Sequence, residues 1–311
     1  MAFRHNSPKK SIIFEPKRED KGNYSHFVHC MQYLYWCIDI IISYNDPKYK
    51  YIIVEPINKS NGRYVKSFLK KILDKVNNIE LISMNTYSGI NKSIIYKKYY
   101  FTPWPSRKGN FNLNDNIISG RILNWFPNNK SKIIRNLLIK RRKTKLRIGL
   151  INRKRTKKNN RVILNNKELC DKIEKKFNIP VSATFFEDKS FEYQIKFFND
   201  HKIIISPHGA QLCSIPFAQD NSLIIECVHE EWHPYEYFTG LSMTSNKYHY
   251  MICDDHSVFP KAYSDKYVNP LRGRSNNSRL NVTVNVDKVI NVIDNYLKNN
   301  NKLPNYNCNL V

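Results

Sequence analysis

The sequence predicts an α/β fold with parallel β-sheets. Short β-branched runs alternate along the chain with longer segments of helical periodicity, as in repeated βαβ units. Some runs, such as residues 203–205, are apolar throughout, which suits a strand buried on both faces of a parallel sheet. The alternation starts again at residue 146, and a chain of 311 residues is long enough for two domains with separate cores.

The first half is expected to hold the first α/β series. Its predicted strands lie at 11–14, 51–55, 79–84 and 93–101. Its predicted helices lie at 23–36, 63–76, 117–126 and 132–140. The first helix has Asn23 as its expected N-cap, and His26 lies in the first turn, outside the apolar stripe. His26 is therefore either a surface or capping histidine or a side chain that faces a cleft.

The second half repeats the pattern. Its predicted strands lie at 146–151, 181–185, 203–205, 223–226, 248–253 and 282–286. Its predicted helices lie at 166–177, 190–199, 237–243 and 287–297, with a further short helix from Ala210.

The composition indicates anionic partners. A formal net charge of +25 favours nucleic acid, an anionic membrane surface or small anionic substrates. The charge is spread along the chain except for the run 140–147, which is either a nucleic-acid contact, a nuclear localisation signal or a solvated helix end.

The loop with His229, Glu230 and His233 lacks the His-Glu-x-x-His spacing of a zinc site, so no metal is expected. No secretory signal or membrane span is recognisable, which predicts a cytoplasmic protein.

Residues 201–212 have the features of a phosphate-binding turn. Pro207 ends a buried strand because it has no N–H to donate, and Gly209 allows a tight turn with close backbone approach. A helix is expected from Ala210, so its N-terminal N–H groups and positive dipole end would face an anion. His208 lies in this turn, where it either donates to a phosphate oxygen or is a buried histidine bonded to backbone.

Charged residues elsewhere in the second half are candidates for the same ligand. Glu226 ends the next predicted strand, where α/β folds hold a ribose hydroxyl. Arg153 and Arg161 flank a basic loop after the strand at 146–151. Guanidinium groups at the carboxyl end of a strand clamp phosphate oxygens bidentately, although a solvated basic turn is the alternative.

The segment 203–226, IIISPHGAQLCSIPFAQDNSLIIE, resembles the signature segment of glycosyltransferase family 61. That family includes plant β-1,2-xylosyltransferase and the EGF-domain O-GlcNAc transferase. Its pattern is a strand, Pro-His-Gly-Ala, a short helix containing a Phe, a turn, and a strand that closes on Glu. The chain departs from the pattern at Gln211, where the family usually has a second Gly.

Two further segments carry the same resemblance. Arg153, Arg161 and Asn165 match the two arginines and the asparagine that precede the signature in the family, while Asn166 stands where Glu is usual. The segment NYSHF, which contains His26, is similar to the family's N-terminal motif.

The resemblance implies a GT-B architecture, in which two Rossmann-like domains with parallel sheets face each other across a cleft. Residues 1–144 would form the acceptor-side domain and 145–283 the domain that binds the nucleotide sugar. The final helix and tail, 284–311, would pack back towards the first domain.

The implied reaction is inverting transfer of a sugar from a UDP-sugar, with UDP-GlcNAc and UDP-xylose as first candidates, to a hydroxyl of a glycan or protein. The implied donor-binding residues are Arg153, Arg161, Asn165, His208, Gly209, Ala210 and Glu226. His208 would also act in catalysis by stabilising the departing diphosphate. His26 is the first candidate for the base, and Glu55 is the second. This set of residues implies no metal cofactor.

Two other functions fit the sequence. One is a basic α/β protein that binds nucleic acid without catalysis, through the run 140–147 and the many tyrosines. The other is a relative that binds nucleotide sugar or glycan without turnover, which the departures at Gln211 and Asn166 leave open.

The abundance of Asn, Lys and Ile is typical of an AT-rich genome, such as that of a large DNA virus, and a viral member would act in the host cytoplasm.

Overall fold

The computed structural model divides into two compact units, Met1–Trp125 and Phe126–Val311. It describes residues 10–16, 37, 40–41, 46–54, 78–82, 86, 88–90, 92, 95–102, 116–119, 146–154, 161–229, 238, 241–242, 247–253, 281–299 and 309–310. The expected boundary at 144/145 lies outside these residues, so the three-part division of the chain stays a prediction. None of the helices within the described ranges has both the length and the apolar character that a membrane span needs.

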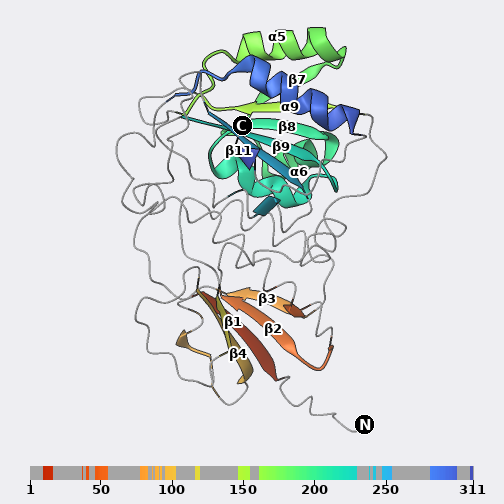
Figure 1. Ribbon diagram of the computed structural model, residues 1–311. Coiled ribbons are helices and arrows are strands. Elements are labelled where there is room, and N and C mark those ends of the chain that lie inside the picture. The colour runs from red at the N-terminus through yellow and green to blue at the C-terminus, as the bar shows by residue number, and fades with distance from the viewer. Residues whose placement is uncertain are drawn as a thin grey trace. The chain divides into compact units, whose positions relative to one another are not determined.

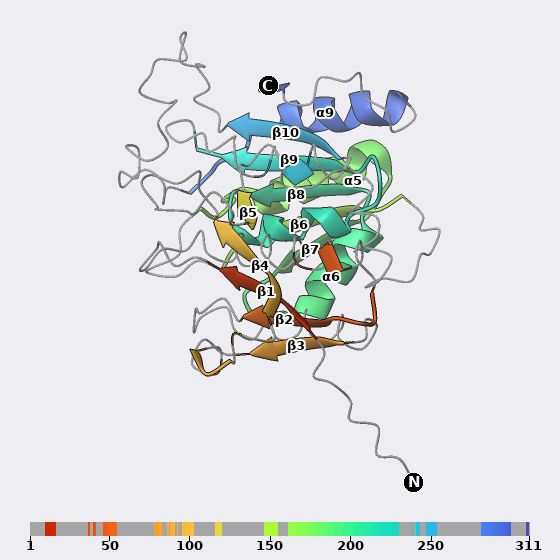
Figure 2. The ribbon, with the colours of Figure 1, turned by 90° about the horizontal axis from the view of Figure 1, so that it is seen from below.

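The first unit contains a five-stranded sheet in the order β3-β2-β1-β4-β5, and all its strand pairs are parallel. Figure 1 labels β1, β2, β3 and β4, and Figure 2 also labels β5. The strands are β1 (Ser11–Pro16), β2 (Lys50–Val54), β3 (Ile79–Ile82), β4 (Ile95–Thr102) and β5 (Asn116–Ser119). Apolar side chains of three strands, Ile13, Ile52, Val54 and Ile82, form a buried cluster on this sheet. The strand order is that of the first five strands of a doubly wound dinucleotide-binding fold.

The first four strands confirm the sequence prediction, but the helix predicted at 117–126 is wrong at its start. Ile117 and Ile118 belong to β5, where they pair with Tyr100 and Phe101 of β4. Two adjacent β-branched residues favour an extended strand, and pairing along the edge of the sheet satisfies their backbone. The helices predicted at 23–36, 63–76 and 132–140 lie outside the described residues.

The second unit contains a six-stranded parallel sheet in the order β11-β10-β9-β8-β6-β7. Its strands are β6 (Ile148–Asn152), β7 (Val181–Phe185), β8 (Ile203–Pro207), β9 (Leu223–Val228), β10 (Tyr248–Cys253) and β11 (Asn309–Leu310). Figure 2 shows β10, β9, β8, β6 and β7 side by side. Every residue of β6, β8 and β9 is buried, as the uninterrupted apolar runs predict for central strands of a parallel sheet.

Three helices and a 3-10 helix connect these strands: α5 (Asn166–Phe177), α6 (Phe191–Asp200), η3 (Ala210–Phe217) and α9 (Val286–Lys298). The start of α6 is capped by Ser190, whose Oγ accepts a hydrogen bond from the N–H of Tyr193. Asn285 caps α9 in the same way, by accepting from the N–H of Lys288. Each cap satisfies a backbone donor that has no partner within the helix, so the caps fix where these helices begin.

The helices α5 and α9 cover one face of the second sheet (Figure 1). Leu169 and Ile173 of α5 and Val289 and Ile293 of α9 are fully buried against alternate residues of the strands. Tyr296 of α9 adds a hydrogen bond of 2.6 Å from its hydroxyl to the carbonyl of Asn221, just before β9. The final helix is therefore part of the core of the second unit, and whether it also reaches the first domain stays a prediction.

The strand order reverses between β6 and β8. From β6 the chain crosses to β7 on one side, and from β8 it continues through β9 to β10 on the other. Pairing between β6 and β8 ends at Leu150 and Ile205, although both strands continue beyond these residues. In open α/β sheets, ligands bind outside the carboxyl ends of the strands at such a reversal. Here those ends lead into Arg153 and His208.

The structure confirms α/β with two parallel sheets and corrects three predicted details of the second half. The helix from Ala210 is a 3-10 helix, whose tighter winding accommodates Pro216 within its length. β9 does not end at Glu226 but continues to Val228. The strand predicted at 282–286 is reduced to isolated bridges, one of which joins Val282 to Ile163, because α9 begins at Val286.

Candidate active site

His208 is held in a fixed orientation directly after β8. Its backbone N–H donates to the carbonyl of Cys227 at 3.1 Å, which continues the pairing of β8 with β9. Its imidazole Nδ1 contacts Oε1 of Glu226, and its ring lies 5.0 Å from that of Phe238. The residue as a whole is 8% exposed. The sequence left open that the ring of His208 bonds to backbone. The partner of its Nδ1 is instead the carboxylate of Glu226.

Glu226 carries the only carboxylate among the fully buried side chains of the described residues, and both of its oxygens are engaged by imidazoles. Oε1 contacts His208, and Oε2 lies 2.9 Å from Nε2 of His249. The other ring nitrogen of His249, Nδ1, lies 2.8 Å from Oγ of Ser242. The contacts of Glu226 are those of a group that orients His208, and a contact with a ribose stays a prediction.

The electrostatics of this pair follow from burial and hydrogen bonding. Burial acts to raise the pKa of Glu226, but the interactions with His208 and then with His249 outweigh it and bring this pKa to about 2. Burial lowers the pKa of His208, Glu226 opposes this shift, and the nearby charges of Arg161 and Arg153 add to it. Glu226 is therefore ionised at neutral pH, while His208 is the group whose charge a ligand would change.

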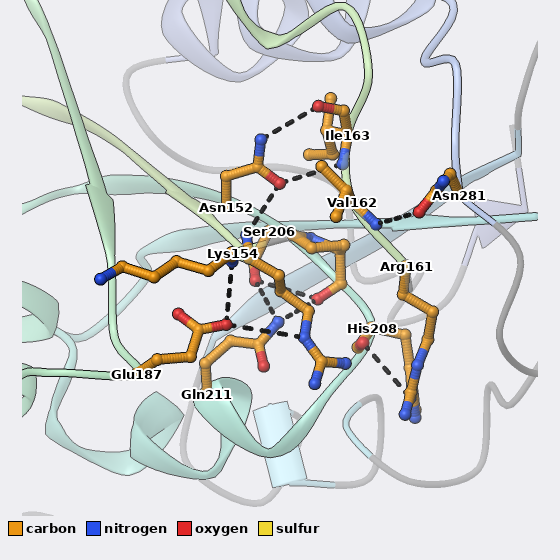
Figure 3. Close-up of polar contacts among 12 residues, drawn as sticks. Asn152, Lys154, Arg161, Val162, Ile163, Glu187, Ser206, His208, Gln211 and Asn281 are labelled. Carbon is orange, nitrogen blue, oxygen red and sulfur yellow. Dashed lines mark hydrogen bonds and ion pairs between the residues drawn. The ribbon is translucent and has the colours of Figure 1, made fainter. Parts of the chain in front are cut away.

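Arg161 and Arg153, both predicted to bind the donor, lie close enough to His208 to lower its pKa, and their contact with a donor stays a prediction. Nη1 of Arg161 donates to the backbone carbonyl of His208 at 3.4 Å (Figure 3). The backbone of Arg161 has a φ of 71°, in the left-handed region that residues with a side chain seldom occupy. Such strained residues gather at ligand sites. Nε of Arg153 lies 4.0 Å from Oε1 of Glu187, and its side chain is largely buried.

Asn152, the last residue of β6, links the two arginines and was not predicted. Its Oδ1 accepts from the N–H of Arg153 at 2.9 Å and from the N–H of Ile163 at 2.9 Å. Its Nδ2 donates to the carbonyl of Ile163 at 3.0 Å (Figure 3). The side chain thereby fixes both the residue after β6 and the segment that begins at Arg161. A polar residue that ends an otherwise apolar run, as in IGLIN, is the sequence signal that could have identified it.

Asn165, a predicted donor-binding residue, ties the segment before α9 to the segment before α5. Its Nδ2 donates to the carbonyl of Val284 and its Oδ1 accepts from the N–H of Val284, both at 2.9 Å. This exchange takes the place of a ladder pair beside the bridge from Ile163 to Val282. Its contacts are those of a structural tether, and a direct contact with the donor stays a prediction.

The turn at Gly209 is covered by the side chain of Gln211. Nε2 of Gln211 donates to the carbonyl of Pro207 at 2.7 Å and to Oγ of Ser206 at 3.2 Å (Figure 3). A Cβ added to Gly209 would lie 2.5 Å from Oε1 of Gln211, so the glycine leaves room for this side chain. Ala210 begins η3. The departure from Gly at position 211 thus gives the turn additional hydrogen bonds.

Some predicted site residues cannot be placed. His26 and Glu55, the two candidates for the base, lie outside the described residues, as do Glu230 and His233 and most of the basic run 140–147. Within the described part of the chain, no three His, Cys, Asp or Glu side chains are grouped as metal ligands would be. The expectation of a metal-independent site stays a prediction.

The family comparison covers most of this site. A family model described as Glycosyltransferase 61 matches residues 24–225, well over half of the chain. The matched range includes Arg153, Arg161 and His208 and ends one residue before Glu226. Among curated proteins, none matches the chain.

Proposed function

The chain belongs to glycosyltransferase family 61, and on this premise we propose that it transfers a sugar from a nucleotide-sugar donor to a hydroxyl of a glycan or protein acceptor. UDP-GlcNAc and UDP-xylose are the first candidates for the donor. The reaction inverts the anomeric centre, and the two units adopt a GT-B arrangement around the substrates. A parallel α/β sheet in each unit supports this arrangement.

The observation that carries the proposal is the position of His208 at the strand-order reversal, with Arg161 on its carbonyl and Glu226 on its imidazole. Negative charge grows on the diphosphate as the bond to the sugar breaks. A preorganised donor aimed at that charge lowers the barrier by about 3 kcal/mol. His208, Arg153, Arg161 and the backbone N–H groups of Gly209 and Ala210 supply such donors in the proposal.

The proposed step is a single displacement. The acceptor oxygen attacks the anomeric carbon, the bond from that carbon to the phosphate oxygen breaks, and its electron pair leaves with the diphosphate. A base on the opposite side of the sugar takes the hydroxyl proton, with His26 as first candidate and Glu55 as second. The cationic side chains balance the charge of the leaving group, so we expect transfer without a bound divalent metal.

Glu226 acts in the proposal by holding His208. A carboxylate on Nδ1 of an imidazole fixes the ring and directs Nε2 towards the ligand, as in other sites where histidine exchanges protons. Oε1 of Glu226 engages Nδ1 of His208 in this way, and Oε2 contacts Nε2 of His249. We propose this orienting role in preference to a ribose contact.

The test is a thermal-shift and turnover assay of the purified protein with UDP, UDP-GlcNAc, UDP-xylose and UDP-glucose. We expect UDP and one UDP-sugar to raise the melting temperature, and release of UDP from that sugar with or without EDTA. His208→Ala should abolish this release, whereas the control Arg147→Ala, an exposed change at the amino end of β6, should retain it. Full activity of His208→Ala would contradict the proposal. Binding without turnover in the wild type would instead identify an inactive relative.

A further inference from the structure

A continuous chain of polar contacts extends from His208 into the core of the second unit. It connects His208 to Glu226, Glu226 to His249 at 2.9 Å, and His249 to Ser242 at 2.8 Å. Glu226 and Ser242 are completely buried, and His249 is 1% exposed. The sequence identified neither His249 nor Ser242 as a site residue, and the function described above assigns them no role.

The register of the sheet explains why Glu226 and His249 meet. Ile225 and Cys227 of β9 and Tyr250 and Ile252 of β10 face the cluster under α5 and α9. Because side chains alternate along a strand, Glu226 and His249 face the opposite side of the sheet. Ser242 is brought to the same place by a hydrogen bond of 2.9 Å from the N–H of Lys247, just before β10, to its carbonyl.

The donors and acceptors of this chain are determined by chemistry. An ionised carboxylate only accepts, so Nε2 of His249 and Nδ1 of His208 must both carry protons. When the ring of His249 is neutral, its Nδ1 is then an acceptor, and the hydroxyl of Ser242 donates to it. His208 is thereby held with its proton on Nδ1, and any further proton is gained or lost at Nε2.

We propose that His249 and Ser242 are positioning residues, which share the charge of Glu226 and fix the tautomer of His208, so that the proton exchanged with the departing diphosphate is carried on Nε2. This inference rests on the proposed function for its last clause only. Among the described residues, Glu226, Arg153 and Arg161 carry the charges that act on the pKa of His208. A bound diphosphate adds negative charge to this set, so donor binding is accompanied by protonation of His208.

Matched substitutions of His249 separate positioning from packing. His249→Gln places an amide N–H at about the same reach as Nε2 and keeps the hydrogen bond to Glu226. His249→Leu keeps the bulk and removes the donor. Loss of one donor raises the proton affinity of the pair His208 and Glu226, since a hydrogen bond to a charged group is worth about one pKa unit or more.

The direct test uses protein labelled with ¹⁵N-histidine and long-range ¹H–¹⁵N spectra, with His208 identified among the nine histidines by its loss in His208→Gln. We expect the neutral wild-type ring to carry its proton on Nδ1. The titration midpoint of His208 should rise by about one pH unit in His249→Leu, and it should stay near the wild-type value in His249→Gln.

A proton on Nε2 in the neutral wild type, or an unchanged midpoint in folded His249→Leu, overturns the proposal. If near-UV circular dichroism shows that His249→Leu is unfolded, Ser242→Ala replaces it, and an unchanged midpoint there has the same meaning.

A second measurement keeps this inference distinct from the proposed function. Calorimetric titration with UDP in two buffers of different ionisation enthalpy gives the number of protons taken up on binding. We expect uptake in the wild type near neutral pH and reduced uptake in His249→Leu, in which a larger fraction of His208 is protonated before UDP binds. If UDP fails to bind the wild type while the spectra show the expected tautomer, the proposed function fails and the positioning chain stands. If UDP binds without proton uptake, the coupling to the diphosphate is refuted.

Discussion

The side chain of Asn152 forms a two-way hydrogen-bonded pair with the backbone of Ile163, accepting at 2.9 Å and donating at 3.0 Å. Through this pair the last residue of β6 holds the segment that begins at Arg161, two residues before Ile163. The same oxygen accepts from the N–H of Arg153. One amide thus sets the positions of both arginines.

Asn152→Ala should therefore reduce both stability and ligand binding. It leaves the N–H and carbonyl of Ile163 buried without these partners, at a cost of about 2–4 kcal/mol in the free energy of unfolding. Urea unfolding measures this loss, and UDP titration measures the effect on the arginines. The exposed change Asn291→Ala on α9 is the control and should leave both quantities near wild type. Equal stability of the two variants would contradict the role given to Asn152.

Replacing either arginine with lysine should weaken UDP binding although the charge is kept. Lysine cannot present the planar pair of donors that grips two phosphate oxygens. We expect Arg153→Lys and Arg161→Lys each to raise the dissociation constant of UDP roughly tenfold, or about 1.4 kcal/mol. Arg147→Lys, at the opposite end of β6, should leave the constant unchanged. Equal affinity in all three variants would mean that charge alone attracts the ligand.

The depressed pKa of Glu226 predicts a specific acid sensitivity. A carboxyl group with a pKa of about 2 when folded and 4.5 in its ordinary environment stabilises the fold above pH 4.5, and this contribution is lost as the pH falls towards 2. The contribution is on the order of 3 kcal/mol. Urea unfolding between pH 5 and 2 should show a shallower loss of stability for Glu226→Gln than for the wild type. The exposed change Glu80→Gln, which lies in the first unit, should follow the wild-type profile.

Gly149, the second residue of β6, is expected to tolerate no side chain. A Cβ there would lie 2.7 Å from two ring atoms of Phe197 and 2.9 Å from the ring of His201, and neither ring can move aside freely. Gly149→Ala should lower the free energy of unfolding by about 1–3 kcal/mol because of this overpacking. At Gly89 the nearest atom to a new Cβ is at 3.6 Å, an ordinary contact. Thermal unfolding of Gly89→Ala should therefore be close to that of the wild type.

The sequence predicted the second sheet well because its central strands β6, β8 and β9 are largely apolar runs bounded by turns. The strand β7 and the helix α5 have the predicted limits, and the grouping of Arg161 with His208 was also expected. The sequence did not reveal the contact between His249 and Glu226. A histidine in a strand that mixes polar and apolar residues does not indicate which residue of the neighbouring strand it will contact. That information lies in the register between β9 and β10.

Asn152 and Asn165 were difficult to interpret for a related reason. Each pairs with backbone groups more than ten residues away in the sequence, and backbone partners leave no trace in side-chain patterns. The error at 117–119 has a local cause instead, since a helical spacing and a short β-branched edge strand are equally compatible with so few residues.

The two-residue strand β11 has a practical consequence for handling the protein. Asn309 and Leu310 cover the outer edge of β10 beside Tyr250 and Met251, next to His249. An uncovered strand edge invites pairing with another chain. Affinity tags and fusion partners are therefore better attached at the N-terminal end, where they do not disturb the pairing of β11 with β10.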